Sequence, residues 1–446
     1  MPLALLALAL GGFTIGTGEF VTAGLLPQIA GSLHVSIPTA GYLISAYAIG
    51  VVLGAPLLTA LCAHRPARRV LVGLLGVMAI GNLASALAPT FGLLVGARVL
   101  AALAHGAFFG VGSVVASRLA KPGQAGRAVA TMFLGLTFSN VAGVPLGTLL
   151  GQHVGWRWTF AAIGGLTVAS CAGTVALLPA DLPATGTGIA AELRTFRSGT
   201  VWYGLAITAV AQSALFASIS YVAPMATRVS HVSASTVPLV LVLFGLGSCV
   251  GIYAGGRVGE LRLQAGLVGG LGSVTGVLVL LAVAVQQPAV LVVGFLLLGV
   301  TAFFFAPLLQ VQVLQAASDA PTLASAANQG AFNVGNALGA FIGGLVIDAG
   351  LGYAAPNAAG AVFSAAALIL VLTVGRAFRP RPPAVTGPGQ ERAAPSTARS
   401  SASSGVGWPA SISAAKPASG DITASRPTRT TPTTSARPTA RSQSSW

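Results

Sequence analysis

Hydrophobic residues fill most of this chain in runs of about 20 residues, the length at which an α-helix crosses a hydrocarbon core of about 30 Å. Short polar turns separate the runs. The pattern predicts an all-α integral membrane protein with twelve transmembrane helices. The predicted spans are 3–29, 39–61, 70–88, 91–116, 128–151, 158–179, 201–225, 236–256, 264–285, 288–313, 323–347 and 357–375.

Composition supports a membrane protein. Of the 446 residues, 54% are hydrophobic and 7% are charged, which leaves too few charges for a water-soluble surface. The net charge of +15 is shared by the loops and the tail without interleaved aromatic residues, so nucleic acid is not an expected partner. The three cysteines lie in or beside apolar runs and predict no disulfide framework.

Loop charges predict the orientation of the spans, because Lys and Arg collect in cytoplasmic loops. With the N-terminus inside, the opposite loops hold only Arg157 and Arg228. We therefore expect a multi-pass protein of the cell membrane with both termini in the cytoplasm. The first run lacks a basic start and a clear cleavage site, so we expect it to be retained. The basic residues of the predicted cytoplasmic loops are Arg65, Arg68, Arg69, Arg118, Lys121, Arg127, Arg194, Arg197, Arg257 and Arg262.

An internal repeat at an offset of 196 residues indicates two related halves. The matched positions are Asn140, Gly143 and Gly147 in the fifth run and Asn336, Gly339 and Gly343 in the eleventh. We expect an N-terminal six-helix bundle at 1–180, a cytoplasmic linker at 181–200 and a C-terminal six-helix bundle at 201–375. The tail at 376–446 is basic and poor in large apolar residues, which predicts disorder. It either touches anionic lipid headgroups or is dispensable.

Glu19 is the only carboxylate before Asp181, and it lies within the first apolar run. A charge in hydrocarbon costs about 2.5 to 3.5 kcal/mol on insertion scales, so an acid here predicts a function in proton coupling. Arg98 lies deep in the fourth run, and we expect it to pair with Glu19 directly or through water. His105 lies on about the same helical face as Arg98. It either takes part in proton coupling or makes a structural hydrogen bond to a neighbouring helix.

Four segments of the first half carry recognisable motifs: 16–27 (GTGEFVTAGLLP), 54–69, 96–106 (GARVLAALAHG) and 143–147 (GVPLG). Together they resemble the major facilitator superfamily, in particular its twelve-span drug/proton antiporters. Three further segments make the chain similar to actinobacterial chloramphenicol-resistance exporters, whose relatives include sugar-efflux permeases. These are 218–224 (SISYVAP), 242–248 (VLFGLGS) and 331–335 (AFNVG). The resemblance covers residues 1–375 and implies two pseudo-symmetric six-helix bundles.

The antiporter motif of that family corresponds to Gly143, Pro145, Gly147 and Gly151. Glycines every four residues form one face that allows close helix packing, and the proline is expected to kink the helix. The resemblance implies that this motif seals the interface between the halves and favours export. Val144 splits the usual Gly-Pro pair, and a plain packing face is the alternative interpretation.

The gating loops of the family correspond to one basic loop in each half. His64 stands where the family has an aspartate, and Ala67 stands where it has a glycine. A charge latch is therefore expected to be stronger in the second half, where Glu260 supplies the acid. For the first loop, an orientation signal alone is the alternative. The candidate residues are His64, Arg65, Arg68 and Arg69 in the first half and Arg257, Glu260 and Arg262 in the second.

A substrate site is expected near the membrane midplane between the halves. Aromatic rings and amides suit a neutral or mildly amphipathic molecule such as chloramphenicol. Alternatively, the phenylalanines meet lipid or other helices, and Asn140 and Asn336 join helices. The candidate lining residues are Tyr47, Asn140, Gln212, Phe216, Tyr221, Phe304, Asn328, Asn333 and Asn336.

The pattern as a whole predicts a secondary transporter that works by alternating access. Proton-coupled efflux of a small hydrophobic drug such as chloramphenicol is the first hypothesis. The alternatives are a sugar-type efflux permease, an uptake symporter, and a transport-dead receptor or scaffold. No phosphate-binding lysine loop, metal-ligand cluster or nucleophile arrangement occurs in the sequence, so we expect no enzyme activity, cofactor or metal. The expected partners are a small-molecule substrate, protons and the lipid bilayer, and we expect a monomer.

Overall fold

The computed structural model describes residues 3–62, 64–121, 125–180, 182–183, 198–317 and 321–374, and these segments are helical apart from short turns. Among these residues, twelve helical stretches are long and apolar enough to span a membrane. The twelve predicted spans are thus confirmed, with ends that differ by a few residues. Most of the predicted linker, including Arg194 and Arg197, and the tail at 376–446 lie outside the described residues.

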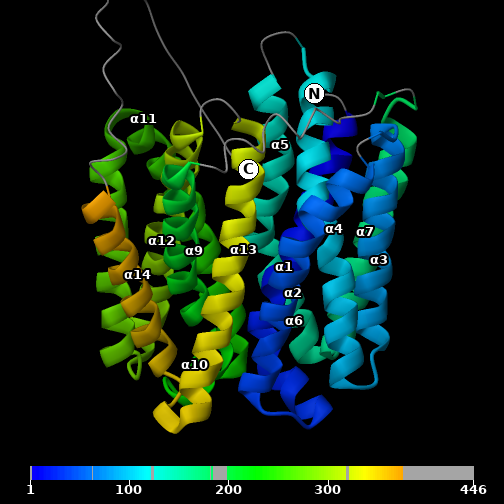
Figure 1. The fold of residues 1–446 in the computed structure, drawn as a ribbon. Helices are drawn as coiled ribbons and strands as arrows, with labels where there is room; N and C mark the ends of the chain where they lie inside the picture. Colours follow the sequence, from blue (N-terminus) through cyan, green and yellow to red (C-terminus); the bar gives the residue numbers. More distant parts are fainter. Residues whose placement is uncertain are drawn as a thin grey trace, which may run out of the picture. The chain divides into compact units, whose positions relative to one another are not determined.

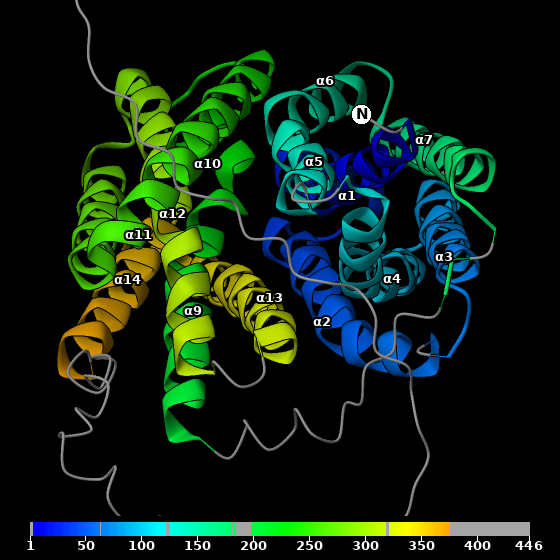
Figure 2. The same ribbon diagram turned by 90° about the horizontal axis from the view of Figure 1, so that it is seen from above.

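The helices form two groups that follow the order of the chain (Figures 1 and 2). The first group comprises α1 (Leu3–Leu33), α2 (Ile37–Cys62), α3 (Ala67–Leu87), α4 (Phe91–Leu119), α5 (Ala125–Phe138), the π-helical turn η1 (Ser139–Gly143), α6 (Val144–His153) and α7 (Trp156–Leu177). The second group comprises α9 (Gly199–Ile219), α10 (Val222–Arg228), the 3₁₀ turn η3 (Ala234–Thr236), α11 (Val237–Ala284), α12 (Pro288–Ala316), α13 (Pro321–Val346), the π-helical turn η4 (Ile347–Leu351) and α14 (Ala355–Val374).

Each group buries its own apolar side chains. In the first group Met78 and Phe108 pack with Leu8 of α1. In the second group Phe295 and Phe305 of α12 are fully buried. Large apolar residues elsewhere on the helices remain exposed, as helices that face lipid require. The two groups are therefore two helical bundles, each with its own core, as the predicted major facilitator fold requires.

The seventh predicted span is broken, whereas a single helix over 201–225 was expected. Helix α9 ends at Ile219, and α10 begins at Val222. Pro224 explains the break, because it has no N–H to donate to the Ser220 carbonyl and its ring clashes with a helix continuing through that carbonyl. The Tyr221 amide instead bonds to the Ser218 oxygen.

Two other predicted spans also differ in detail. The fifth changes from α to π winding at Ser139–Gly143, a turn that ends two residues before Pro145, the position at which a kink was expected. The eighth and ninth spans follow one another as α11, with a single non-helical residue, Arg262, where a loop was expected. The side chain of Glu260 in this region lies outside the described residues.

The two groups touch at the end of the bundle that carries the α1–α2 turn. Ser45 of α2 donates a hydrogen bond to the Ala337 carbonyl of α13 at 2.9 Å. Gln152 of α6 donates to the Ala234 carbonyl at 2.9 Å. Helices α2 and α13 lie side by side here (Figure 1). We call this region, from the middle of α1 to the α1–α2 turn, the closed end.

Candidate functional site

Glu19 lies in the middle of α1 and is only 8% exposed. Its Oε1 accepts a hydrogen bond of 3.0 Å from the Nδ2 of Asn336 on α13. The Oδ1 of Asn336 accepts in turn from the Nε2 of Gln212 on α9, at 2.9 Å. A buried carboxylate of the first half is therefore hydrogen-bonded through one amide to two helices of the second half.

Glycines on α13 bring these groups together. A Cβ on Gly335 would lie 2.4 Å from the Ala209 carbonyl oxygen, and one on Gly339 would lie 2.4 Å from the Ser213 carbonyl oxygen. Only glycine allows α13 to approach the α9 backbone this closely. Asn336, between the two glycines, is thereby held within hydrogen-bond reach of α9.

Arg98 does not contact the Glu19 carboxylate directly, so of the two arrangements expected from the sequence the direct pair is not present. Its guanidinium, in a residue with 0% exposure, donates to the Gly18 carbonyl at 2.5 Å and to the Asn82 Oδ1 at 3.4 Å. Its carbon also lies 4.4 Å from the ring centre of Tyr47. A backbone carbonyl, an amide and an aromatic face thus accommodate the cation.

Arg98 and Glu19 still influence one another. Gly18, whose carbonyl binds Arg98, directly precedes Glu19 in α1, and the two charges interact electrostatically. The guanidinium therefore lies on the side of α1 that faces the other helices of the first half. Asn336 occupies the second-half side.

His105 is joined to this group only through an aromatic side chain. Its Nδ1 lies 3.4 Å from the Tyr47 hydroxyl, and its ring is 5.5 Å from that of Phe109. His105 is 2% exposed. A hydrogen bond to a neighbouring helix was the structural alternative for this residue, and this contact corresponds to it.

The predicted lining residues separate into two sets. Tyr47, Gln212 and Asn336 lie around Glu19 and Arg98, as described above. Phe216 is near the same place, since its ring is 5.5 Å from that of Phe20, the residue after Glu19. These four side chains form, with Glu19, the polar and aromatic group on which a site between the halves would be built.

The other predicted lining residues have different neighbours. Tyr221 is fully buried at the closed end, where its hydroxyl donates to the Ala340 carbonyl at 2.8 Å. The Phe304 ring packs against Gly270, in the part of α11 that follows Arg262. Asn333 donates to the Gln329 carbonyl of its own helix. Asn140 is 4% exposed, and its backbone meets Gly245 of α11.

Asn328 belongs to a polar network within the second half that the sequence did not reveal. Its Oδ1 accepts from the Thr208 hydroxyl at 2.7 Å, and its Nδ2 donates to the Gln310 Oε1 at 2.7 Å. Gln310 donates in turn to the Ser325 hydroxyl at 2.9 Å. Asn328 is fully buried, so its hydrogen-bonding groups are used between helices. Polar residues inside apolar runs were the available signal, but their pairing depends on how α9, α12 and α13 pack.

The glycines of the predicted antiporter motif pack within the first half. A Cβ on Gly143 would meet Thr17 of α1, and one on Gly151 would meet Leu25 of α1. The close approach expected of this face is therefore present, but its partner is α1 and not the other half. The contact with the second half comes from another face of the same span, where Val144 joins the second-half core.

The predicted gating loop of the first half fastens helix ends within that half. Arg68 donates to the Val175 carbonyl near the end of α7, and the Ala67 amide donates to the Leu182 carbonyl at 3.2 Å. His64, Arg65 and Arg69 are exposed. In the second half the Arg257 guanidinium lies 5.1 Å from the Tyr253 ring, and Arg262 forms the kink of α11.

Comparison with known families decides the class of this protein. The sequence profile described as Major Facilitator Superfamily matches residues 8–328 and 205–419. The chain belongs to the major facilitator superfamily. It is accordingly a multi-pass secondary transporter of the cell membrane, and the resemblance inferred from the motifs is confirmed.

Relatives in the major facilitator superfamily align over nearly their whole length. Inner membrane transport protein YdhP of Escherichia coli (strain K12) is 41% identical over 372 residues, which cover 83% of this chain and 96% of the relative. The chloramphenicol resistance protein of Streptomyces lividans is 34% identical, with coverage of 83% and 95%. A probable sugar efflux transporter of Pasteurella multocida is 32% identical, with coverage of 82% and 90%.

A solved structure shows the same fold. The bacterial homologue of the human lysosomal transporter Spinster, in its inward-facing and unoccupied conformation, superposes with a TM-score of 0.68 at 16% identity. The match covers 84% of this chain and 97% of that one. At this identity the likeness concerns the arrangement of the helices.

Proposed function

We propose that this chain is a proton-coupled exporter of a small, largely apolar molecule, with chloramphenicol as the first candidate. One observation carries the proposal, namely the hydrogen bond from Asn336 of the second half to the buried carboxylate of Glu19 in the first. A group able to bind a proton thus contacts both of the bodies that move in alternating access. The chloramphenicol resistance relative supports the class of cargo. The cargo crosses without chemical change.

The charge on Glu19 sets the strength of this contact. A hydrogen bond to an ionised carboxylate is roughly twice as strong as one between neutral groups. The ionised, empty carrier is therefore held shut at the closed end. Proton binding weakens the hydrogen bond between Asn336 and Glu19, because it removes the charge on the carboxylate. A cargo molecule that binds the amides of Asn336 and Gln212 competes with Glu19 for the Asn336 amide.

This arrangement favours exchange over co-transport. An antiporter requires that the empty, deprotonated carrier does not reorient, because such a step would uncouple the two fluxes. In the proposed cycle the contact between Asn336 and Glu19 is released either by a proton or by a cargo molecule. The carrier then takes the proton across the membrane in one direction and the cargo in the other, in separate steps. With the orientation predicted from loop charges, the closed end faces outward and the empty carrier waits open to the cytoplasm.

Everted membrane vesicles test the proposal. In vesicles energised by respiration, chloramphenicol should dissipate the pH gradient when the parent chain is present and should not do so with Glu19→Gln. Asp348→Asn is the matched control, because it makes the same change at an exposed carboxylate in η4, and it should behave like the parent. If Glu19→Gln responds like the parent, the proton role of Glu19 is wrong. If no compound of an antibiotic panel disturbs the gradient, drug/proton exchange is overturned.

Sugar efflux is the second candidate, because one relative is a probable sugar efflux transporter. Amides such as those of Asn336 and Gln212 also suit hydroxyl groups. The same vesicles distinguish the two candidates when a series of mono- and disaccharides replaces the antibiotic panel. A response to sugars alone selects this second function.

A further inference from the structure

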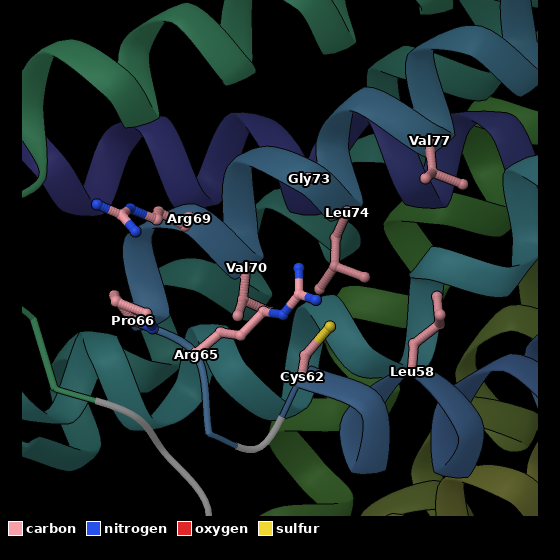
Figure 3. Close-up of a pocket in the computed structure, with 9 residues that line it drawn as sticks. All are labelled: Leu58, Cys62, Arg65, Pro66, Arg69, Val70, Gly73, Leu74 and Val77. Atoms are coloured by element: carbon pink, nitrogen blue, oxygen red, sulfur yellow. The ribbon is translucent and has the colours of Figure 1, made fainter.

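A groove between the end of α2 and the start of α3 is not used by the proposed transport cycle. It has a volume of about 410 Å³ (Figure 3). Leu58 and Cys62 of α2 form one wall, and Val70, Leu74 and Val77 of α3 form the other. The apolar wall on α3 extends from Val70 to Val77, which is eight residues or about 10 Å of helix. The groove is thus elongated and has mainly apolar walls.

Two arginines lie at the mouth of this groove, where the helices leave the membrane. In Figure 3 the Arg65 side chain extends across the opening beside Cys62 and Leu74, whereas Arg69 starts at the rim and its side chain points away from the opening. Both arginines are exposed. Their neighbour Arg68 differs, because it bonds to the Val175 carbonyl.

The arginines at the mouth lack a negative partner in the part of the chain that the structure describes. The sequence has no Asp or Glu between Glu19 and Asp181, and His64 occupies the position before Arg65. Neither Arg65 nor Arg69 forms an ion pair among the described residues. Two positive charges at the membrane surface therefore remain available to an external anion.

We propose that this groove binds an anionic phospholipid, whose phosphate meets Arg65 and Arg69 and whose acyl chain lies between Leu58 and Leu74. Arginine suits phosphate because its planar group donates two parallel hydrogen bonds. A free phosphate ion would use only the mouth, whereas a phospholipid also fills the apolar walls. Basic residues at the membrane surface attract anionic lipids in the same way. The inference does not depend on the proposed cargo.

Native mass spectrometry of the purified full chain tests the headgroup contact. Phosphatidylglycerol and phosphatidylcholine are titrated separately, and the dissociation constant of the first bound lipid is measured. Arg65→Gln with Arg69→Gln should weaken phosphatidylglycerol binding about 25-fold, at roughly fivefold per charge, and leave phosphatidylcholine unchanged. Lys121→Gln with Arg127→Gln removes the same charge at two other exposed positions and should have little effect. Inorganic phosphate should not displace the lipid.

Gly73 allows a separate test of the groove. It lines the groove, and a Cβ there would meet nothing within 4 Å, so the Cβ of Gly73→Phe enters open space and its ring can occupy the groove. This variant should weaken binding of both lipids at the first site. Gly165→Phe is the matched control on α7, also in open space, and should bind like the parent.

Several outcomes would overturn the proposal. Equal losses in the two double variants would mean a general surface charge effect. Unchanged binding in Gly73→Phe would mean that no acyl chain enters the groove. Displacement by inorganic phosphate would mean an ion site without a lipid. Circular dichroism and size-exclusion chromatography establish that each variant is folded, so a loss of binding reports the site.

Discussion

Asn336 joins two halves of the molecule through a single amide, which donates to Glu19 and accepts from Gln212. A hydrogen bond to a charged group contributes about 1.5 to 3 kcal/mol. Removing this amide therefore frees the carboxylate without deleting the proton site. A variant at Asn336 should therefore affect the coupling of the drug and proton fluxes while the carboxylate that binds the proton stays in place.

We expect Asn336→Ala to loosen coupling. Because the empty carrier is no longer held shut, drug accumulation against a gradient should fall by roughly 10- to 100-fold, the factor that corresponds to the lost hydrogen bond. Downhill drug exchange should persist, but it should need a higher drug concentration, because the cargo also loses the Asn336 amide and keeps only that of Gln212. Uptake of labelled drug by everted vesicles measures both. Asn333→Ala is the control, since Asn333 bonds to Gln329 of its own helix; an equal loss in this variant would contradict the interpretation.

The sequence revealed Glu19 and Arg98 because a charge in an apolar run is conspicuous. It did not reveal their hydrogen-bond partners. Arg98 uses the Gly18 carbonyl, and a carbonyl is present at every residue, so no pattern distinguishes it. Asn336 was singled out for its place in the repeat, but its contact with Glu19 depends on how closely α13 approaches α1.

At the scale of elements, hydrophobic run length was sufficient to predict the spans, because the bilayer fixes how long an apolar helix must be. Interruptions within the spans were harder to predict. Pro145 and Pro224 are visible in the sequence, yet one is preceded by a π turn and the other by a break at Ser220. Which of these forms depends on the helices that satisfy the freed backbone groups.

The contact at the closed end between α2 and Tyr221, in the break between α9 and α10, is tested by Gly41→Leu. A Cβ on Gly41 would lie 2.3 Å from the Tyr221 hydroxyl oxygen, and this side chain is fixed by burial and by its bond to Ala340. We expect the two halves to separate at this end. Spin labels on cysteines introduced at Ser32 and Ser235, both exposed, should show a longer distance in a background without native cysteines.

Gly92→Leu is the control for this experiment. Gly92 is exposed in the first turn of α4, and a Cβ there meets nothing within 4 Å. The labels should report the parent distance in this variant. If Gly41→Leu also keeps the parent distance, the contact between Gly41 and Tyr221 does not hold the closed end.

At the scale of the whole molecule, duplication and loop charges predicted two related halves and an orientation. They did not predict which end of the molecule is closed. A rocking transporter needs two arrangements of similar free energy, so one sequence encodes both. The side chains buried at the closed end, such as those of Ile37 and Tyr221, have no sequence pattern that distinguishes a carrier closed at this end from one closed at the other.

Glu19 is the only carboxylate in the described spans that lies away from the span ends. In the proposed exchange this limits the cycle to one proton for each cargo molecule. One charge moving through 100 mV releases about 2.3 kcal/mol, which corresponds to roughly a 50-fold concentration ratio. For a neutral cargo, the steady-state ratio in vesicles should therefore rise no faster than about 50-fold per 100 mV of proton-motive force. If the concentration ratio rises more steeply with proton-motive force, the cycle must carry a second proton. Measuring this slope therefore gives the number of acidic groups in the membrane that carry a proton in each cycle.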